Sequence, residues 1–276
     1  MININNLFVV IDPSTDKQYA LQRAMRIAKV LDAKIHAYLC IFSGVEAHDP
    51  EALRRVETAR YEPWLESTVE PARAAGFDVT TELEWNQDWR EAIGIAAERA
   101  DSDLIVKSSH RRTAKKRLMM TSSDLILLES ANCSVQLVST EVVSDITRAL
   151  IALDPKREDE KDQSIFKTVV TWGKAVKESA LENGELHAVY AYTSSDEFRN
   201  VGDVAKRADI DPSHIHQVYG RPEEAIVEVA REIDAQIIII GLSTKSTLTN
   251  RIFGSMTDRL LNNLDHDILV VIPDEE

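Results

Sequence analysis

The sequence of 276 residues contains the same pattern twice, once in each half. Four segments of the first half return in the second, each with similar or identical residues. The pairs are 9–13 with 151–155, 34–38 with 185–189, 91–93 with 224–226, and 104–106 with 237–240, the last with an ambiguity of one residue. A repeat of this length indicates a duplicated domain. Because each half is long enough to bury its own core, we expect two tandem domains, residues 1–143 and 144–276.

Short apolar runs alternate with segments of helical spacing in both halves. The strands expected in the first half are 7–12, 33–41, 79–85, 104–106 and 135–138, and those expected in the second are 149–153, 185–192, 215–218, 237–240 and 268–272. Helices are expected between them, including 51–75, 88–100 and 122–129, and a short one with a weak apolar pattern within 196–209. The linker is expected near 139–147.

The run 237–240 is apolar at every position, as is required of a central parallel strand covered by helices on both sides. The expected fold is therefore α/β, with two tandem doubly wound parallel sheets of Rossmann-like type. Ligands of such folds lie beyond the carboxyl ends of the strands, where the strand order reverses.

Charge and cysteine content narrow the possible partners. The formal net charge of −14 disfavours nucleic acid and acidic membranes, although the basic cluster 111–117 suits either a phosphorylated ligand or a solvated loop. The start of the chain has no signal-peptide pattern and no run of about 18 apolar residues occurs, so we expect a cytoplasmic protein without a transmembrane segment. Cys40 and Cys133 suggest neither a disulfide framework nor a zinc site, and both are expected to be buried.

A glycine-bearing segment follows one of the expected strands of the second half. The strand 237–240 leads into Gly241, and after Thr244 come nine residues and then Gly254-Ser255 at the start of a helix. Glycine lets the backbone approach phosphate oxygens, and a helix N-terminus directs free N–H groups toward negative charge. The segment resembles the phosphate motif of the universal stress protein family, Gly-x-x-Gly, nine residues, Gly-Ser or Gly-Thr. With the duplicated strand-Asp pattern and the closing strand 267–273, the resemblance covers the whole chain.

The resemblance implies an adenine nucleotide site in the second half and the fold shared with adenine nucleotide alpha hydrolase-like proteins. It would place Asp154 at the ribose or adenine, the Ala191 backbone near the base, and Gly241, Thr244, Gly254 and Ser255 around the phosphates of ATP with its Mg²⁺. Thr244 stands where nucleotide-binding members have glycine, so its side chain either crowds the phosphates or donates to them. The competing interpretation is a loop that only turns a strand into a helix.

The first half lacks these glycines. The corresponding positions are taken as Lys107, His110, Met120 and Thr121, so ATP is not expected there in the family manner. Lys107, His110 and Arg111 form either a basic pocket for another anion or a solvated loop. The terminal strands pair across the dimer in the family, which implies that the two halves form an intramolecular pseudo-dimer, with further dimerisation left open.

Other chemistry finds little support in the sequence. No P-loop, G-x-G-x-x-G, G-x-S-x-G or H-E-x-x-H motif occurs. His214 and His216 suit either metal ligands or a polar surface strand, of which the second is favoured, and His36 and His187 are expected to be structural. Asp12 and Asp154 either contact a ligand or cap a turn.

Because no second catalytic group stands beside Asp154, regulation is expected rather than catalysis, with slow ATP hydrolysis at most. Two functions remain open. One is a stress-response protein that binds ATP or a small ligand in its second half and acts on an unidentified protein partner. The other is a nucleotide-free interaction scaffold.

Overall fold

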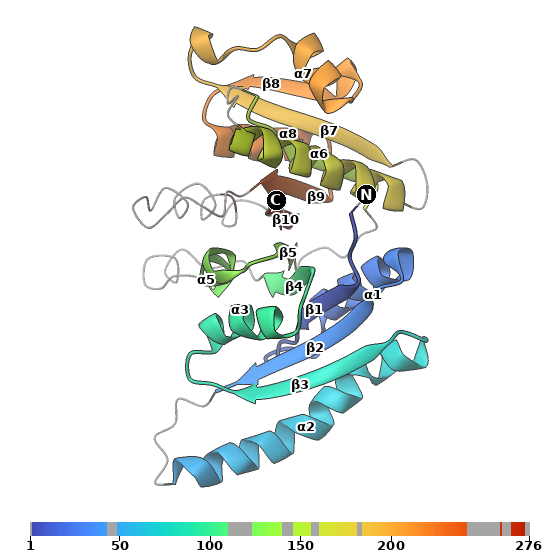
Figure 1. The fold of residues 1–276 in the computed structure, drawn as a ribbon, viewed down its shortest axis with the longest axis vertical. Coiled ribbons are helices and arrows are strands. Elements are labelled where there is room, and N and C mark those ends of the chain that lie inside the picture. The colour runs from blue at the N-terminus through green and yellow to red at the C-terminus, as the bar shows by residue number, and fades with distance from the viewer. Residues whose placement is uncertain are drawn as a thin grey trace. The chain divides into compact units, whose positions relative to one another are not determined.

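The computed structural model describes residues 2–42, 49–109, 123–139, 146–155, 160–180, 184–241, 260 and 266–273 (Figure 1). The chain divides into two compact units, an N-terminal unit over most of residues 3–138 and a C-terminal unit over most of residues 139–276. The domain boundary between residues 143 and 144 remains a prediction.

The N-terminal unit is an α/β unit in which β1 lies between β2 and β4. Its strands are β1 (Asn6–Val10), β2 (Lys34–Ile41), β3 (Val79–Trp85), β4 (Leu104–Ser109) and β5 (Ser134–Ser139), in the order β3-β2-β1-β4-β5. Its helices are α1 (Tyr19–Leu31), α2 (Pro50–Ala74), α3 (Trp89–Arg99) and α5 (Ser123–Ser130). The pairs β1–β2, β2–β3 and β1–β4 are parallel, so the strand order reverses next to β1.

The C-terminal unit repeats this arrangement around β6. Its strands are β6 (Arg148–Ala152), β7 (Glu185–Tyr192), β8 (Ile215–Tyr219), β9 (Ile237–Gly241) and β10 (Asp267–Val271), in the order β10-β9-β6-β7-β8 with every pair parallel. Its helices are α6 (Glu160–Ser179), α7 (Val201–Ala208) and α8 (Pro222–Glu232), with 3₁₀ turns η1 (Ser195–Glu197) and η2 (Pro212–His214). The predicted α/β class with parallel sheets is confirmed.

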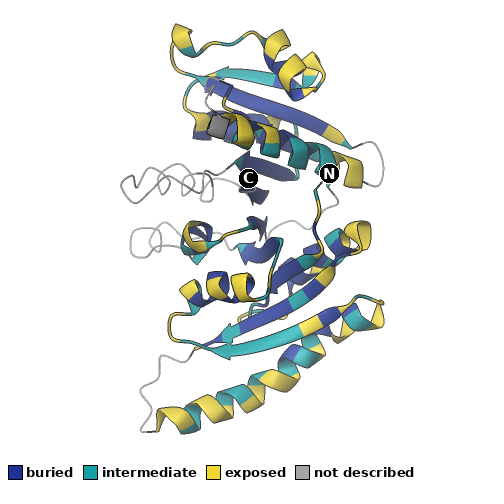
Figure 2. Ribbon diagram, viewed as in Figure 1, coloured by how far each residue is buried: buried dark blue, intermediate teal, exposed yellow. Residues whose placement is uncertain are grey.

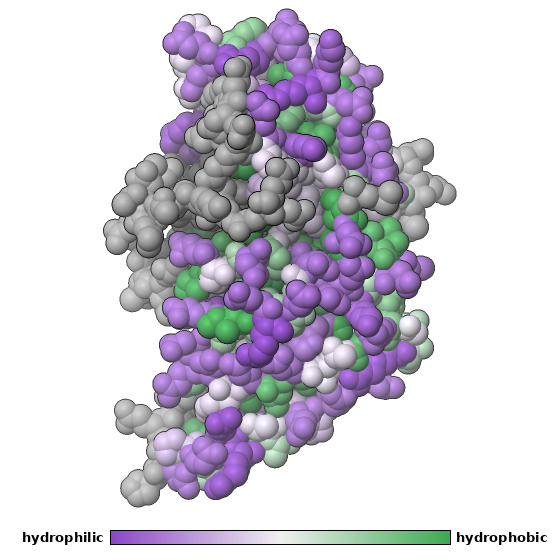
Figure 3. All heavy atoms as spheres, viewed as in Figure 1, coloured by the Kyte–Doolittle hydropathy of each residue, from purple (hydrophilic) through white to green (hydrophobic). Residues whose placement is uncertain are grey.

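The strands form the core because their side chains are apolar on both faces. Leu7, Phe8 and Val9 of β1 are fully buried, and Ile237–Ile240 of β9 are buried as well (Figure 2). Burial of each such side chain stabilises a fold by roughly 1.5–3 kcal/mol. The visible surface of the described residues is instead largely hydrophilic, with apolar side chains scattered among polar ones (Figure 3). None of the described helices is long and apolar enough to cross a membrane.

One predicted element lies where it was expected, and another extends further than expected. The short helix predicted within residues 196–209 is present as α7. In contrast, β4 continues to Ser109, beyond the predicted strand 104–106, and so includes Lys107. The side chain of Lys107 has a buried partner, Asp124, that the local sequence does not indicate.

Aspartates occupy left-handed backbone positions where glycine is usual. They are Asp32 (φ 54°), Asp101 (φ 50°), Asp209 (φ 53°) and Asp234 (φ 52°). Asp32 ends α1 and donates its N–H to the Ala28 carbonyl, and Asp209 ends α7 and donates to the Ala205 carbonyl. Aspartate tolerates this conformation better than most residues, although glycine adopts it without steric cost.

Candidate functional site

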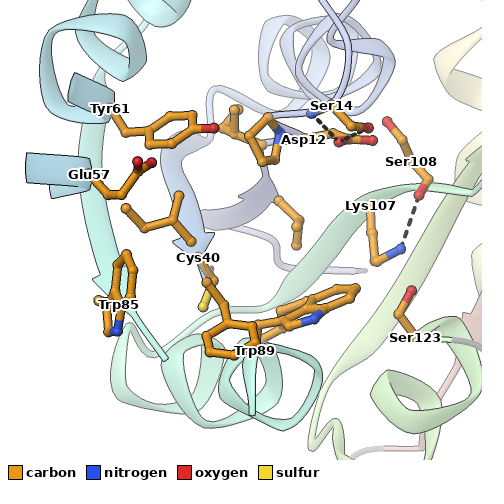
Figure 4. A pocket seen from close by; sticks show the side chains of 16 residues that line it. Asp12, Ser14, Cys40, Glu57, Tyr61, Trp85, Trp89, Lys107, Ser108 and Ser123 are labelled. Carbon is orange, nitrogen blue, oxygen red and sulfur yellow. Dashed lines mark hydrogen bonds between the residues drawn. The ribbon is translucent and has the colours of Figure 1, made fainter. Parts of the chain in front are cut away.

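A cavity of about 550 Å³ lies at the carboxyl ends of the strands of the N-terminal unit (Figure 4). Its wall is formed by residues at the ends of β1, β2 and β3, by β4 and by three helices. They are Val10, Ile11, Asp12, Pro13, Ser14, Cys40, Ile41, Phe42, Glu57, Tyr61, Trp85, Trp89, Ile93, Lys107, Ser108 and Ser123. The strand order reverses between β1 and β4, so the cavity occupies the position at which doubly wound folds bind ligands.

Aromatic side chains form much of the cavity wall. Tyr61 of α2, Trp85 of β3 and Trp89 of α3 surround the same space (Figure 4), and Phe42 follows β2. The Phe42 and Trp85 rings meet edge to face with centroids 6.4 Å apart, and the Arg90 guanidinium lies 5.0 Å from the centre of the Trp89 ring. This group was not predicted from the sequence, because its members come from segments that meet only in the fold.

Lys107 lines the cavity but its charge is already paired. Its Nζ donates to Asp124 Oδ1 at 2.6 Å and to the Ser108 carbonyl at 3.1 Å. The other oxygen of Asp124 accepts from Ser109 Oγ at 2.7 Å. Lys107 and Asp124 are only 9% and 7% exposed, so the interpretation of Lys107 as part of a solvated loop is wrong. His110 and Arg111, which were predicted to accompany it, lie outside the described residues.

Asp12 follows β1 and caps the turn that leads to α1. Its Oδ1 accepts from Ser14 N at 2.8 Å and from Ser14 Oγ at 2.6 Å. Gln18 closes the turn, because its side chain accepts from Asp12 N at 3.0 Å and donates to the Asp12 carbonyl at 2.8 Å. The turn-capping interpretation is thus confirmed for Asp12, which also contributes to the cavity wall.

Cys40 lines the cavity near a part-buried hydrogen-bonded pair. The hydroxyl of Tyr38 donates to Glu84 Oε2 at 2.9 Å, and burial raises the pKa of Tyr38 well above its usual value. Burial likewise raises the pKa of Cys40 to about 11 and that of Cys133 to about 12. Both cysteines are half-buried rather than fully buried as predicted. At neutral pH both are protonated thiols, which are poor nucleophiles.

The C-terminal unit brings three of its predicted site residues to one edge of the sheet. Asp154 follows β6 and is exposed, Ala191 is buried in β7, and Gly241 ends β9. Since β6 lies between β7 and β9, these residues stand at or near the carboxyl ends of adjacent parallel strands. The other predicted residues, Thr244, Gly254 and Ser255, lie outside the described residues.

Gly241 is explained by packing against α6. A β-carbon at Gly241 would lie 2.4 Å from Ile165 Cγ2 and 2.8 Å from Val169 Cγ2. These separations are far shorter than normal contacts between carbon atoms. Glycine therefore fits here without displacing these side chains, whether or not a phosphate binds beyond the strand.

The strand registers correct one correspondence between the halves. Val9 pairs with Val106 in the N-terminal unit, and its equivalent Ile151 pairs with Ile239 in the C-terminal unit. Counting onward, Ser108 corresponds to Gly241, so the predicted match of Lys107 with Gly241 is wrong by one residue. The Oγ of Ser108 accepts from Ala20 N, in the first turn of α1, at 3.1 Å.

The repeated histidines have different surroundings. In the N-terminal unit, His36 contacts Thr80 Oγ1 at 2.9 Å and Glu82 Oε2 at 3.0 Å. In the C-terminal unit, His187 Nδ1 lies 3.1 Å from His216 Nε2, and the His187 ring stacks on that of His214 with centroids 4.3 Å apart.

The surroundings of the C-terminal histidines also affect their protonation. Burial, and then the neighbouring His214, lower the pKa of His187, and burial lowers the pKa of His216. Within the described part of the chain, no group of three or more His, Cys, Asp or Glu side chains is arranged to hold a metal ion.

Comparison with known proteins identifies the family. The universal stress protein family profile matches residues 3–139 and again residues 157–271. The chain belongs to the universal stress protein family. It carries two Usp segments in tandem, one in each unit, and we call these units the N-terminal and C-terminal Usp domains.

Two similar proteins match both segments, and a third matches about half of the chain. Universal stress protein E of Photorhabdus laumondii is 26% identical over 303 residues, covering 99% of this chain and 96% of that protein. A universal stress protein structure from Archaeoglobus fulgidus covers 98% of this chain and 97% of its own, with a TM-score of 0.77 and 17% identity, and so shows the shared fold. A universal stress protein in complex with cAMP covers 48% of this chain and all (100%) of its own, with 21% identity and a TM-score of 0.35.

Proposed function

We propose that this universal stress protein is a regulatory small-ligand-binding protein, and that one ligand occupies the cavity of its N-terminal Usp domain. The single observation that carries the proposal is a cavity of about 550 Å³ at the carboxyl ends of the strands. Ligand pockets typically have volumes of about 300–1,000 Å³ and combine apolar walls with a few polar groups. This cavity fits both criteria, since aromatic rings and the polar side chains of Asp12, Ser14 and Ser108 line it together.

Binding rather than catalysis is proposed for this cavity. The thiol of Cys40 is held protonated by burial, which raises its pKa to about 11. The ammonium of Lys107 is engaged within the protein, because it is paired with Asp124 at 2.6 Å. A ligand enclosed here would stabilise the folded domain and supply a signal to a protein partner.

A cavity-filling substitution tests the proposal. Glu57 of α2 lines the cavity, whereas Glu62 on the same helix is exposed. Native mass spectrometry of the purified protein is expected to detect a bound small molecule in the wild type and in the control variant Glu62→Trp. The variant Glu57→Trp is expected to lose it, because the larger side chain occupies the cavity. Equal ligand occupancy in the two variants, or none in any protein after incubation with a metabolite extract, would contradict the proposal.

The C-terminal Usp domain is a second candidate site, for an adenine nucleotide such as ATP with Mg²⁺. The proposed contacts are Asp154, Ala191, Gly241, Thr244, Gly254 and Ser255. The observation that favours it is the position of Asp154, Ala191 and Gly241 at the carboxyl side of three adjacent strands. The competing function is a nucleotide-free scaffold.

Isothermal titration with ATP separates these possibilities. We expect a dissociation constant no tighter than micromolar, about −8 kcal/mol, for the wild type. If the Thr244 side chain crowds the phosphates, Thr244→Gly binds more tightly. If its hydroxyl donates to them, Thr244→Ser retains the affinity and Thr244→Gly loses it. Absence of binding by all three proteins would favour the scaffold.

A further inference from the structure

The wall of the N-terminal cavity is unusually rich in aromatic rings for this chain. Trp85 and Trp89 line it, although the whole sequence contains only 4 tryptophans. Tyr61 and Phe42 add two further rings from α2 and from the end of β2 (Figure 4). Each of these rings offers an edge or a face for offset stacking or edge-to-face contact with a flat ligand.

The charged groups of the wall do not suit a phosphate. Among the described residues that line the cavity, the charged side chains are the carboxylates of Asp12 and Glu57 and the ammonium of Lys107. Lys107 Nζ is 2.6 Å from Asp124 Oδ1, and both side chains are about one-tenth exposed. This ammonium also donates to the Ser108 carbonyl, so a phosphate would meet a cation whose charge is already balanced by the buried Asp124 carboxylate.

The polar groups at the β1 side of the cavity are also engaged within the protein. Ser108 Oγ accepts from the backbone N–H of Ala20, and Ser14 N donates to the Asp12 carboxylate. The Ser108 hydroxyl and the Ser14 N–H, which both belong to lining residues, are therefore already hydrogen-bonded within the chain. This arrangement differs from a phosphate cradle, in which free N–H groups of the backbone face the anion.

We infer that the N-terminal cavity selects a flat aromatic ligand that carries no phosphate, held between the rings of Tyr61, Trp85 and Trp89. The inference rests on the proposed function, because it names the class of ligand for the same cavity. A ring with a neutral or positive charge suits this wall, since cations are attracted to aromatic faces and to the carboxylate of Glu57.

Ligand-observed NMR and isothermal titration with matched probes test the inference on the full chain. Three probes, adenosine, AMP and ATP, share the adenine base and differ in phosphate. Tryptamine serves as a cationic aromatic, and ribose 5-phosphate as a phosphate without an aromatic ring. The binding signal of each probe that is lost in Glu57→Trp is assigned to the N-terminal cavity. Adenosine or tryptamine is expected to bind there at least tenfold more tightly than AMP, ATP or ribose 5-phosphate.

Two variants give the matched comparison. Trp89→Leu is expected to weaken aromatic binding at least tenfold, while Trp172→Leu on α6 of the other domain leaves it unchanged.

Asp124→Asn removes the charge paired with Lys107 and is expected to shift the AMP-to-adenosine affinity ratio several-fold toward AMP. An unchanged ratio would contradict the role given to the Lys107–Asp124 pair, whereas Trp89→Leu tests the aromatic wall independently.

The failure of the inference is distinguishable from failure of the proposed function. Tighter binding of ATP or ribose 5-phosphate, sensitive to Glu57→Trp, would overturn the aromatic inference and keep the cavity as a ligand site. Absence of binding by both adenosine and tryptamine at millimolar concentration would also overturn it. A co-purified ligand lost in Glu57→Trp would still support the proposed function.

Discussion

The two Usp domains place different residues at the carboxyl ends of equivalent strands. In the N-terminal domain, Ser108 reaches from β4 to the first turn of α1 and accepts a hydrogen bond from Ala20 N. In the C-terminal domain, Gly241 takes the same place at the end of β9, and α6 packs where a side chain would stand. Helix and strand are thus joined by a hydrogen bond in one copy and by close packing in the other.

The preceding position differs even more. Lys107 forms a buried ion pair, whereas the equivalent Ile240 contributes an apolar side chain to the core. The two copies thus share their strands but differ in the side chains at these two positions near the carboxyl ends of β4 and β9. At these two positions the domains therefore differ, whereas Asp12-Pro13 and Asp154-Pro155 after β1 and β6 are the same in both.

The largest expected effect comes from making β4 resemble β9. Lys107→Met leaves Asp124 as a buried charge without its cation, so we expect the free energy of unfolding of the N-terminal domain to fall by about 3–5 kcal/mol. The double variant Lys107→Met with Asp124→Leu is expected to recover most of this loss. Urea denaturation followed by circular dichroism measures both.

Ile240→Met is the matched control in the C-terminal domain. It keeps an apolar side chain of similar volume and is expected to cost less than about 1.5 kcal/mol. A single Lys107→Met variant as stable as the wild type would show that the ion pair does not distinguish the domains.

An exchange at the next position has a smaller expected effect. Gly241→Ser places a β-carbon 2.4 Å from Ile165 Cγ2, so we expect a loss of about 1–3 kcal/mol in the free energy of unfolding. Ile165→Ala in the same chain makes room and is expected to reduce that loss. The reverse change, Ser108→Gly, removes one hydrogen bond and is expected to cost about 1 kcal/mol. Thermal denaturation that shows no effect of Gly241→Ser would remove the packing explanation for this glycine.

The smallest expected effect concerns pH and the histidines of the C-terminal domain. Burial depresses the pKa values of His187 and His216 in the folded state, although the carboxylates of Glu185 and Glu232 oppose the shift. Below the ordinary histidine pKa of about 6.5, the unfolded chain therefore binds more protons than the folded one. Stability is expected to fall as the pH drops from 7.5 to 5.5, by at most about 1.4 kcal/mol per pH unit for each proton.

The variant His216→Gln checks this prediction. Glutamine keeps a polar side chain beside His187 but does not titrate, so the loss of stability between pH 7.5 and 5.5 is expected to shrink. Urea midpoints measured in this range provide the test. A wild-type protein that becomes more stable on acidification would contradict the prediction.

Most of the fold was predictable because its signals are local. The strand Val79–Trp85 has the bounds expected from its sequence, and the α7 helix lies in the short segment where one was expected. Apolar runs predict buried strands, and the repeat predicts the same order of elements in both halves. The extension of β4 through Lys107 was missed because the partner Asp124 belongs to another element.

The candidate site was less predictable than the fold. The rings of Tyr61, Trp85 and Trp89 come from a helix, a strand end and a second helix, and no sequence spacing links all three. The glycine signal at Gly241 was visible, but its packing against Ile165 depends on the position of α6. Sequence patterns locate the carboxyl edge of a sheet, while the side chains that meet there depend on the tertiary structure.

The aspartates in left-handed conformation have a consequence for protein engineering. Asp101 and Asp234 follow α3 and α8 at equivalent places in the two domains, and each has a φ near 50°. A non-glycine residue in this conformation costs about 1 kcal/mol, and a negative charge near a helix C-terminus adds an unfavourable interaction with the helix dipole. These positions, which lie outside the cavity wall, are therefore candidates for stabilising substitutions. Replacing Asp101 with glycine is expected to raise the thermal stability of the N-terminal domain, whereas the same change at Asp234 also removes a carboxylate 3.6 Å from Arg148 Nη1 and is expected to gain less.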